Sequence, residues 1–247
     1  AGSYSYGELA ERVNRFASAL ATLGVDMEQR VLLAMLDGID WPTAFLGAIR
    51  AGVVPVAANT LLTTKDYAFM LEDSRARVLF VSEALLPQFE PLIGKLPFLK
   101  HVVVSGKDAK GHLSFRDLLG KGKEEFPVAR TTCGDACLWL YSSGSTGAPK
   151  GTVHVHSSMI LTAELYARPI LGIREDDVVF SAAKLFFAYG LGNGFSFPLS
   201  VGATTVLMAE RPTPAAVFKR IVERKPTIFY GVPTLYAALL AHPELGP

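Results

Sequence analysis

The run Tyr-Ser-Ser-Gly-Ser-Thr-Gly-Ala-Pro-Lys-Gly, residues 141–151, decides how this chain folds, because it places a polar, glycine-rich loop between two apolar segments. Residues 136–141 form an apolar run of strand length, and residues 152–155 are rich in β-branched side chains. A flexible linker has a similar composition, but this run lies inside apolar segments rather than between domains. The pattern therefore predicts two strands joined by a loop.

The composition of this loop indicates an anion-binding site. Gly144, Gly147 and Gly151 allow positive φ angles and a close approach of backbone N–H groups to an anion. Hydroxyl donors and one cation stand among these glycines: Ser142, Ser143, Ser145, Thr146 and Lys150. Because hydroxyl and ammonium groups donate to phosphate oxygens, we predict that the loop binds the phosphates of a nucleotide.

The spacing of the loop excludes a Walker A motif. That motif has two glycines separated by four residues, then a lysine, then a Ser or Thr that holds magnesium. Here Pro149 stands in place of the second glycine and has no N–H, and Gly151 has no hydroxyl for a metal ion. The Walker A interpretation therefore fails at two positions.

These residues resemble the phosphate loop of the acyl-adenylate-forming enzymes, a superfamily of acyl-CoA synthetases, aryl-CoA ligases, peptide-synthetase adenylation domains and luciferases. The resemblance is specific, because few other families combine such a Ser/Thr/Gly run with a following Pro-Lys-Gly. It implies that the loop binds ATP while a carboxylate attacks the α-phosphate to give an acyl-AMP and pyrophosphate, after which CoA attacks in the ligases. Lys150 would be the catalytic cation, and the phosphate-binding set would be Ser142, Ser143, Gly144, Ser145, Thr146, Gly147 and Lys150. ATP, Mg²⁺ and CoA are the implied cofactors and co-substrates.

A second segment, Lys-Leu-Phe-Phe-Ala-Tyr-Gly-Leu-Gly-Asn-Gly at 184–194, resembles the acyl-pocket motif in the form found in the benzoate–CoA ligase branch. The commonest form of this motif begins with proline and has histidine where this chain has Phe187. The resemblance places four residues around a small aromatic acid: Phe187, Ala188, Tyr189 and Gly190. An aromatic face suits an aryl ring, and Ala or Gly leaves room for it. The neighbouring Phe186, Phe195 and Phe197 are predicted to be core residues.

Two other functions stay open. Within the superfamily, the protein could be a ligase for another aryl or acyl acid, or a peptide-synthetase adenylation domain. Amino-acid-activating members carry an acidic residue for the substrate amino group, and Ala188 and Tyr189 offer none. Outside the superfamily's chemistry, the chain could be a non-catalytic nucleotide-binding module.

Composition narrows the remaining classes. A net charge of +1 over 247 residues, without a basic run, argues against a nucleic-acid partner. Residues 185–209 carry no charge, but four glycines and Pro198 make a membrane-spanning helix improbable. Two cysteines favour a reducing compartment, so we expect a cytoplasmic protein, and we expect no metal site within the chain. The sequence leaves a homodimer open.

Apolar runs alternate with helical patterns along the rest of the chain, which predicts an α/β fold: a layered parallel sheet with helices on both faces. Besides the two strands around the loop, strands are expected at residues 30–35, 53–57, 78–82, 102–105, 178–181, 204–208 and 227–230. Helices are expected at residues 5–23, 41–50, 65–72, 214–224 and 233–241, with another following residue 156.

The resemblance makes residues 1–247 the front half of the large N-terminal domain of such an enzyme, with the C-terminal domain absent. We therefore expect the chain alone to be unable to complete adenylation. Charge, glycine and proline rise within residues 106–132 while apolar periodicity fades, so an internal boundary is expected there.

Overall fold

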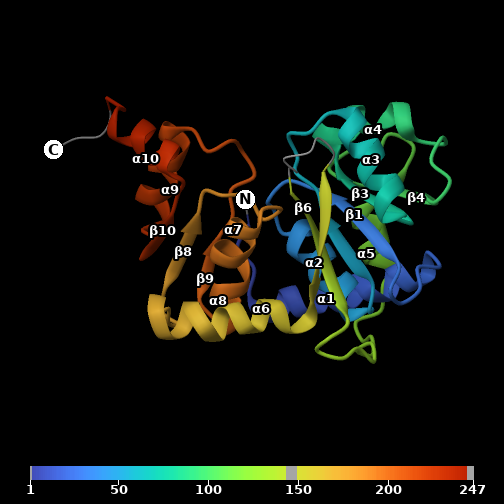
Figure 1. Ribbon diagram of the computed structural model, residues 1–247, viewed down its shortest axis with the longest axis horizontal. Helices are drawn as coiled ribbons and strands as arrows, with labels where there is room; N and C mark the ends of the chain where they lie inside the picture. The colour runs from blue at the N-terminus through green and yellow to red at the C-terminus, as the bar shows by residue number, and fades with distance from the viewer. Residues whose placement is uncertain (1, 143–148, 244–247) are drawn as a thin grey trace. The chain divides into compact units, whose positions relative to one another are not determined.

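The computed structural model describes residues 2–142 and 149–243. The chain divides into two compact units, Ala1–His156 and Ser157–Pro247, and each is described by itself (Figure 1). The predicted helices and strands are present in these units, with ends within two residues of those expected from the sequence.

The first unit alternates strands with helices. Its strands are β1 (Arg30–Ala34), β2 (Val54–Ala57), β3 (Val78–Ser82), β4 (His101–Ser105), β5 (Leu113–Ser114), β6 (Ala136–Ser142) and β7 (Lys150–Val155). Its helices are α1 (Tyr6–Thr22), α2 (Asp40–Arg50), α3 (Thr64–Ser74), α4 (Leu86–Phe89) and α5 (Phe115–Lys121), with single 3₁₀ turns at Glu83–Leu85 and Glu90–Leu92.

The strands of the first unit form one seven-stranded sheet in the order β5-β4-β3-β1-β2-β6-β7. The neighbouring pairs from β5 to β6 are parallel, whereas β6 and β7 pair in the antiparallel direction. The β6–β7 pair is the hairpin expected around the glycine-rich loop. The predicted parallel α/β architecture is thus confirmed, with one antiparallel edge.

Successive strand residues point to opposite sides of the sheet, so apolar strands give it two apolar faces, and helices cover both. On one face, Leu79 and Val81 pack in a cluster with Tyr67 of α3 and with Phe89 of α4. On the other face, the Phe80 ring lies 4.9 Å from the ring of Phe16 in α1 and 6.2 Å from that of Phe115 in α5. Apolar β-strands buried on both faces are typical of parallel sheets.

The segment 106–132, where the sequence predicts an internal boundary, lies inside the first unit, and the division between the two compact units falls between His156 and Ser157. The Arg15 guanidinium donates to the Gly122 carbonyl at 3.2 Å, and Arg50 donates to the Phe126 carbonyl at 2.6 Å. These bonds hold a glycine-rich, charged segment against α1 and α2. The segment is thus attached to these helices through its main-chain carbonyls.

The second unit contains a smaller, fully parallel sheet in the order β10-β8-β9. Its strands are β8 (Val178–Ser181), β9 (Thr204–Val206) and β10 (Ile228–Tyr230). Its helices are α6 (His156–Thr162), which begins at the unit boundary and continues as a π-helix (Ala163–Leu171), α7 (Ala188–Leu191), a π-helical turn (Gly192–Ser196), α8 (Phe197–Val201), α9 (Pro214–Arg224) and α10 (Pro233–Leu240).

Each face of the small sheet has its own core. Val179 and Tyr230 pack with Ala167 of the π-helix, whereas Phe180 packs with Val217 of α9 on the opposite face. The uncharged run 185–209 folds as two short helices, a π-helical turn and a strand. In the part of the chain that the structure describes, no helix combines the length and apolar character needed to cross a membrane.

Candidate active site

The β6–β7 hairpin holds the two described residues of the predicted phosphate-binding set. Ser142 and Lys150 are cross-strand partners at the loop end of the hairpin, and both side chains are exposed. An exposed ammonium at this place is available to an anionic ligand. The other predicted phosphate-binding residues, Ser143, Gly144, Ser145, Thr146 and Gly147, lie outside the described residues.

Tyr141 anchors the base of this hairpin to α3. Its hydroxyl donates a 2.6 Å hydrogen bond to the Asp73 carboxylate, and its ring meets the Phe69 ring edge-on at 6.5 Å. Burial, together with the bond to Asp73, raises the pKa of the Tyr141 hydroxyl, so this group stays protonated as a donor. The residue before the loop is therefore fixed in position.

The glycine at 151 has a packing reason in this hairpin. Gly151 is paired with Tyr141, and a Cβ atom at position 151 would lie 3.2 Å from Tyr141 Cζ and 3.4 Å from Trp139 Cε3. Trp139 itself lies under the Arg30 guanidinium, whose Nε atom donates to the Ser74 carbonyl at the end of α3. Tyr141, Trp139 and Gly151 thus form a packed part of the hairpin next to Lys150.

In the second unit, the predicted acyl-pocket residues follow strand β8 and form the start of α7. Phe187, Ala188 and Tyr189 are exposed, whereas Gly190 is buried. A Cβ atom at Gly190 would lie only 2.1 Å from the Lys184 carbonyl oxygen, so this position tolerates no side chain without a backbone shift. Three exposed residues in sequence, two of them aromatic, form a surface that an apolar ring could cover.

The neighbouring phenylalanines behave as predicted. Phe186, Phe195 and Phe197 are all buried in the second unit, which confirms that they are core residues. The Phe187 side chain remains 47% exposed although its ring centroid lies 4.4 Å from that of Phe186. Burial therefore separates the core aromatics of this segment from those available to a ligand.

Tyr189 also contacts the strand next to β8. Its hydroxyl donates to the Gly231 carbonyl at 3.4 Å, and its ring meets the Tyr230 ring edge-on at 6.3 Å. Burial raises the pKa of Tyr230 to about 12, and its hydroxyl has no hydrogen-bond partner among the described residues. Tyr230 is a neighbour of the predicted pocket that the sequence analysis did not single out.

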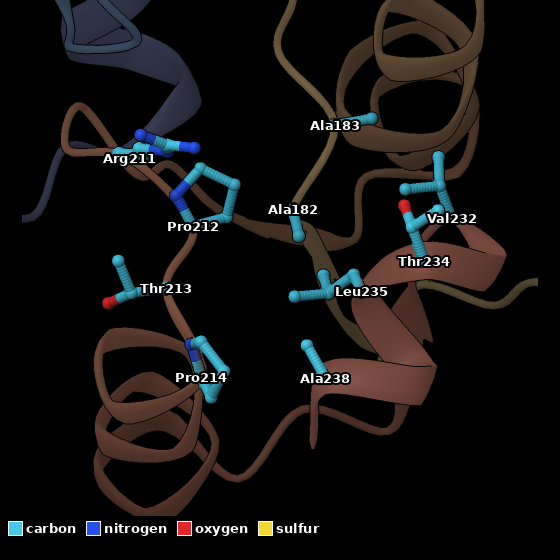
Figure 2. Close-up of a pocket in the computed structure, with 10 residues that line it drawn as sticks. All are labelled: Ala182, Ala183, Arg211, Pro212, Thr213, Pro214, Val232, Thr234, Leu235 and Ala238. Atoms are coloured by element: carbon cyan, nitrogen blue, oxygen red, sulfur yellow. The ribbon is translucent and has the colours of Figure 1, made fainter. Parts of the chain in front are cut away.

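A pocket of about 390 Å³ lies at the carboxyl ends of the small sheet (Figure 2). Pro214 at the start of α9 and Ala238 of α10 line it, with Ala182 from the segment after β8 (Figure 2). β9 follows β8 in the chain and pairs with one edge of it, whereas β10 comes later and pairs with the other edge. The crevice at such a reversal is where open α/β sheets commonly bind ligands.

Sequence reasoning missed this pocket, Asp73 and the anchoring role of Tyr141. Two prolines could have indicated the pocket: Pro214 and Pro233 each stand in the first turn of a helix that follows a strand. A helix that follows a strand in this way starts at the edge of the sheet where the carboxyl ends of the strands lie. The anchors depend on tertiary contacts, which no local pattern reveals.

Comparisons with known proteins identify the family of this chain. The family model described as AMP-binding enzyme matches residues 1–246, so the chain belongs to that family. This confirms the family predicted from residues 141–151.

Particular relatives are aryl–CoA ligases. The chain is 67% identical to a benzoate–CoA ligase of Thauera aromatica, over 99% of this chain and 46% of that protein. It is 50% identical to a 4-hydroxybenzoate–CoA/benzoate–CoA ligase of Rhodopseudomonas palustris, over 98% of the chain and 45% of the relative. A crystal structure of a benzoate CoA ligase from Burkholderia xenovorans LB400 matches with a TM-score of 0.92 and 55% identity, covering 99% of this chain and 48% of the other. The chain thus spans about half the length of the curated relatives it matches.

Proposed function

We propose that this chain is the front part of a benzoate–CoA ligase, an AMP-forming acid–thiol ligase. The observation that carries the proposal is the 67% identity to the Thauera aromatica enzyme over nearly the whole chain. In the proposed reaction, ATP and benzoate give benzoyl-AMP and pyrophosphate, and the CoA thiol then displaces AMP to give benzoyl-CoA.

Lys150 neutralises phosphate oxygens as pyrophosphate leaves. Its place at the end of the hairpin, opposite Ser142, supports this role, because a fixed cation stabilises developing negative charge without reorganising during the reaction. The loop hydroxyls, of which Ser142 belongs to the described residues, orient the phosphates. Catalysis by this part of the enzyme is thus positioning and electrostatic stabilisation.

Phe187, Ala188 and Tyr189 contact the aromatic ring of the acid in this proposal. Their exposure leaves them available to a ligand, and the small Ala188 between two aromatic residues leaves room for a flat ring. The role proposed for Gly190 is steric, because the missing Cβ lets α7 lie against the Lys184 carbonyl.

Magnesium and CoA complete the proposed chemistry. The described residues contain no cluster of three His, Cys, Asp or Glu side chains suited to a metal ion. Mg²⁺ commonly needs only one or two protein carboxylates, since nucleotide phosphates and water supply its other ligands. We assign neither Mg²⁺ nor CoA to particular residues of this chain.

4-Hydroxybenzoate is the second candidate substrate, because the Rhodopseudomonas palustris relative is named for both acids. The test is benzoyl-CoA formation by the full-length protein, measured by mass spectrometry with benzoate and 4-hydroxybenzoate supplied separately. Benzoyl-CoA formation supports the proposal; formation of 4-hydroxybenzoyl-CoA alone would replace the substrate, and no thioester with either acid would reject the proposal.

A further inference from the structure

We propose that Lys184 is a positioning residue for acid recognition, because its ammonium fixes the segment that carries Phe187, Ala188 and Tyr189. This inference rests on the proposed function, in which those three side chains contact the aromatic acid.

The Lys184 side chain bridges from the end of β8 to the end of β9. Its Nζ atom donates to the main-chain carbonyl of Glu210 at 2.7 Å and also to that of Met208. An ammonium carries three donors and no acceptor, so two carbonyls just beyond a strand are suitable partners. Charge-assisted hydrogen bonds of this kind are stronger than neutral ones.

The Lys184 main chain takes part in the turn that starts α7. Its carbonyl accepts a 3.1 Å hydrogen bond from the Phe187 N–H, and the same oxygen lies 2.1 Å from where a Cβ atom of residue 190 would stand. Lys184 therefore supplies both the carbonyl used in the turn into α7 and the ammonium that binds the segment beyond β9. A change in the side-chain tether moves the three exposed residues with it.

Tyr189 supplies the matching tether on the other side, through its hydroxyl bond to the Gly231 carbonyl beyond β10. Because β8 lies between β9 and β10 in the sheet, the segment that follows β8 is held at both neighbouring strands. Such two-sided anchoring fixes side chains that are exposed and would otherwise adopt several positions.

A nearby ion pair provides a matched control on the same loop. The Glu210 carboxylate pairs with Arg220 at 2.8 Å, while Lys184 binds the Glu210 carbonyl instead. Removing the Arg220 guanidinium therefore loosens the loop between β9 and α9 without removing the donors at Lys184.

The experiment compares Lys184→Met, Lys184→Arg and Arg220→Met in the full-length protein. For Lys184→Met we expect the KM for benzoate to rise about tenfold, as loss of charged hydrogen bonds of this kind would give. The KM for ATP should stay within about twofold, and the ratio of kcat/KM for benzoate to that for 4-hydroxybenzoate should change. Lys184→Arg should restore much of the benzoate KM, since it keeps a cationic donor.

Arg220→Met should lower the melting temperature and leave the acid ratio unchanged. An unchanged benzoate KM and acid ratio in Lys184→Met would overturn the inference, as would an equal change in Arg220→Met. If Lys184→Met does not fold, Lys184→Gln keeps an N–H donor group, removes the positive charge and gives the same two readouts. A wild-type protein that activates no aromatic acid would reject the proposed function itself, which is a separate outcome.

Discussion

The Tyr141 hydroxyl donates a 2.6 Å hydrogen bond to Asp73 Oδ2, and this bond ties the last turn of α3 to the strand that leads into the phosphate loop. The same ring occupies the space where a side chain at position 151 would lie. Tyr141 therefore contacts α3 and both strands of the hairpin, next to the strand position of Lys150. These contacts fix the backbone of the hairpin at the position of Lys150.

Tyr141→Phe should lower the free energy of unfolding by about 1 kcal/mol, because it removes one side-chain hydrogen bond and keeps the ring. In the full-length protein it should also raise the KM for ATP more than the KM for benzoate. Urea denaturation and substrate saturation curves measure the two effects. Tyr4→Phe is the control, since it removes the same hydroxyl group and keeps the ring at an exposed position. Identical results for both variants would argue against an anchoring role for Tyr141.

Lys150→Ala in the full-length protein should slow adenylation by about 100-fold or more, the cost typical of losing one preorganised contact to developing charge. Lys150→Arg should retain part of the rate. Lys95 is another exposed lysine and serves as the control, with Lys95→Ala expected to leave the rate unchanged. Adenylation at the normal rate in Lys150→Ala would show that the loop has been assigned to the wrong chemistry.

Tyr189→Ala should shift the preference among aromatic acids more than it changes the affinity for ATP, because it removes an exposed ring beside Tyr230. The measurement is kcat/KM for benzoate, 4-hydroxybenzoate and a short fatty acid. Equal losses for every carboxylate would speak against a role in the pocket.

Gly190→Ala should destabilise the fold by roughly 1–3 kcal/mol, since its methyl group would collide with the Lys184 carbonyl and force the backbone to move. Gly120→Ala is the matched control in α5, where a Cβ meets nothing within 4 Å and alanine favours the helix. Thermal unfolding should therefore show opposite signs for the two variants. A Gly190→Ala protein as stable as the wild type would mean that α7 does not pack as described.

Cys137 predicts how stability depends on alkaline pH. Burial raises the pKa of its thiol from 9.0 to about 12, whereas Cys133 is exposed. The unfolded chain then releases this proton at lower pH than the folded chain, so the contribution of Cys137 is complete below pH 9. It falls as pH rises toward about 12, by at most about 1.4 kcal/mol per pH unit.

Unfolding measured between about pH 8 and 10 tests this sign. Cys137→Ala should flatten the loss of stability over that interval, and Cys133→Ala should not. A thiol reagent at pH 8 should modify Cys133 in the folded protein and Cys137 only after unfolding. Rapid modification of both thiols in the native state would contradict the burial of Cys137.

The strands and helices could be predicted from the sequence because their signals are local. The apolar run 78–82 and the amphipathic pattern of α1 carry their own periodicity, and Ser5 and Thr63 cap their helices as the residue types suggest. The interior place of segment 106–132 could not be predicted, because the contacts of Arg15 and Arg50 that hold it join residues far apart in the chain.

The same distinction applies to the candidate site. A motif gives Lys150 and the 187–190 segment, since their spacing along the chain is the signal. Within the first unit Tyr141 bonds to Asp73, 68 residues away, and within the second unit Lys184 bonds to Met208, 24 residues away, so only the fold of each unit reveals these contacts. Buried Phe186 and exposed Phe187 are adjacent in the sequence and are told apart by packing alone.

The most direct test of the account is carboxylate-dependent ATP–pyrophosphate exchange by the full-length protein, with benzoate, hydroxybenzoates, short fatty acids and amino acids as substrates. The account predicts exchange with benzoate, and silence from the 247-residue chain alone, which spans about half the length of its relatives. Exchange with a different acid would keep the mechanism and change the substrate. Absence of exchange with every acid would contradict the account and leave a nucleotide-binding module as the better description.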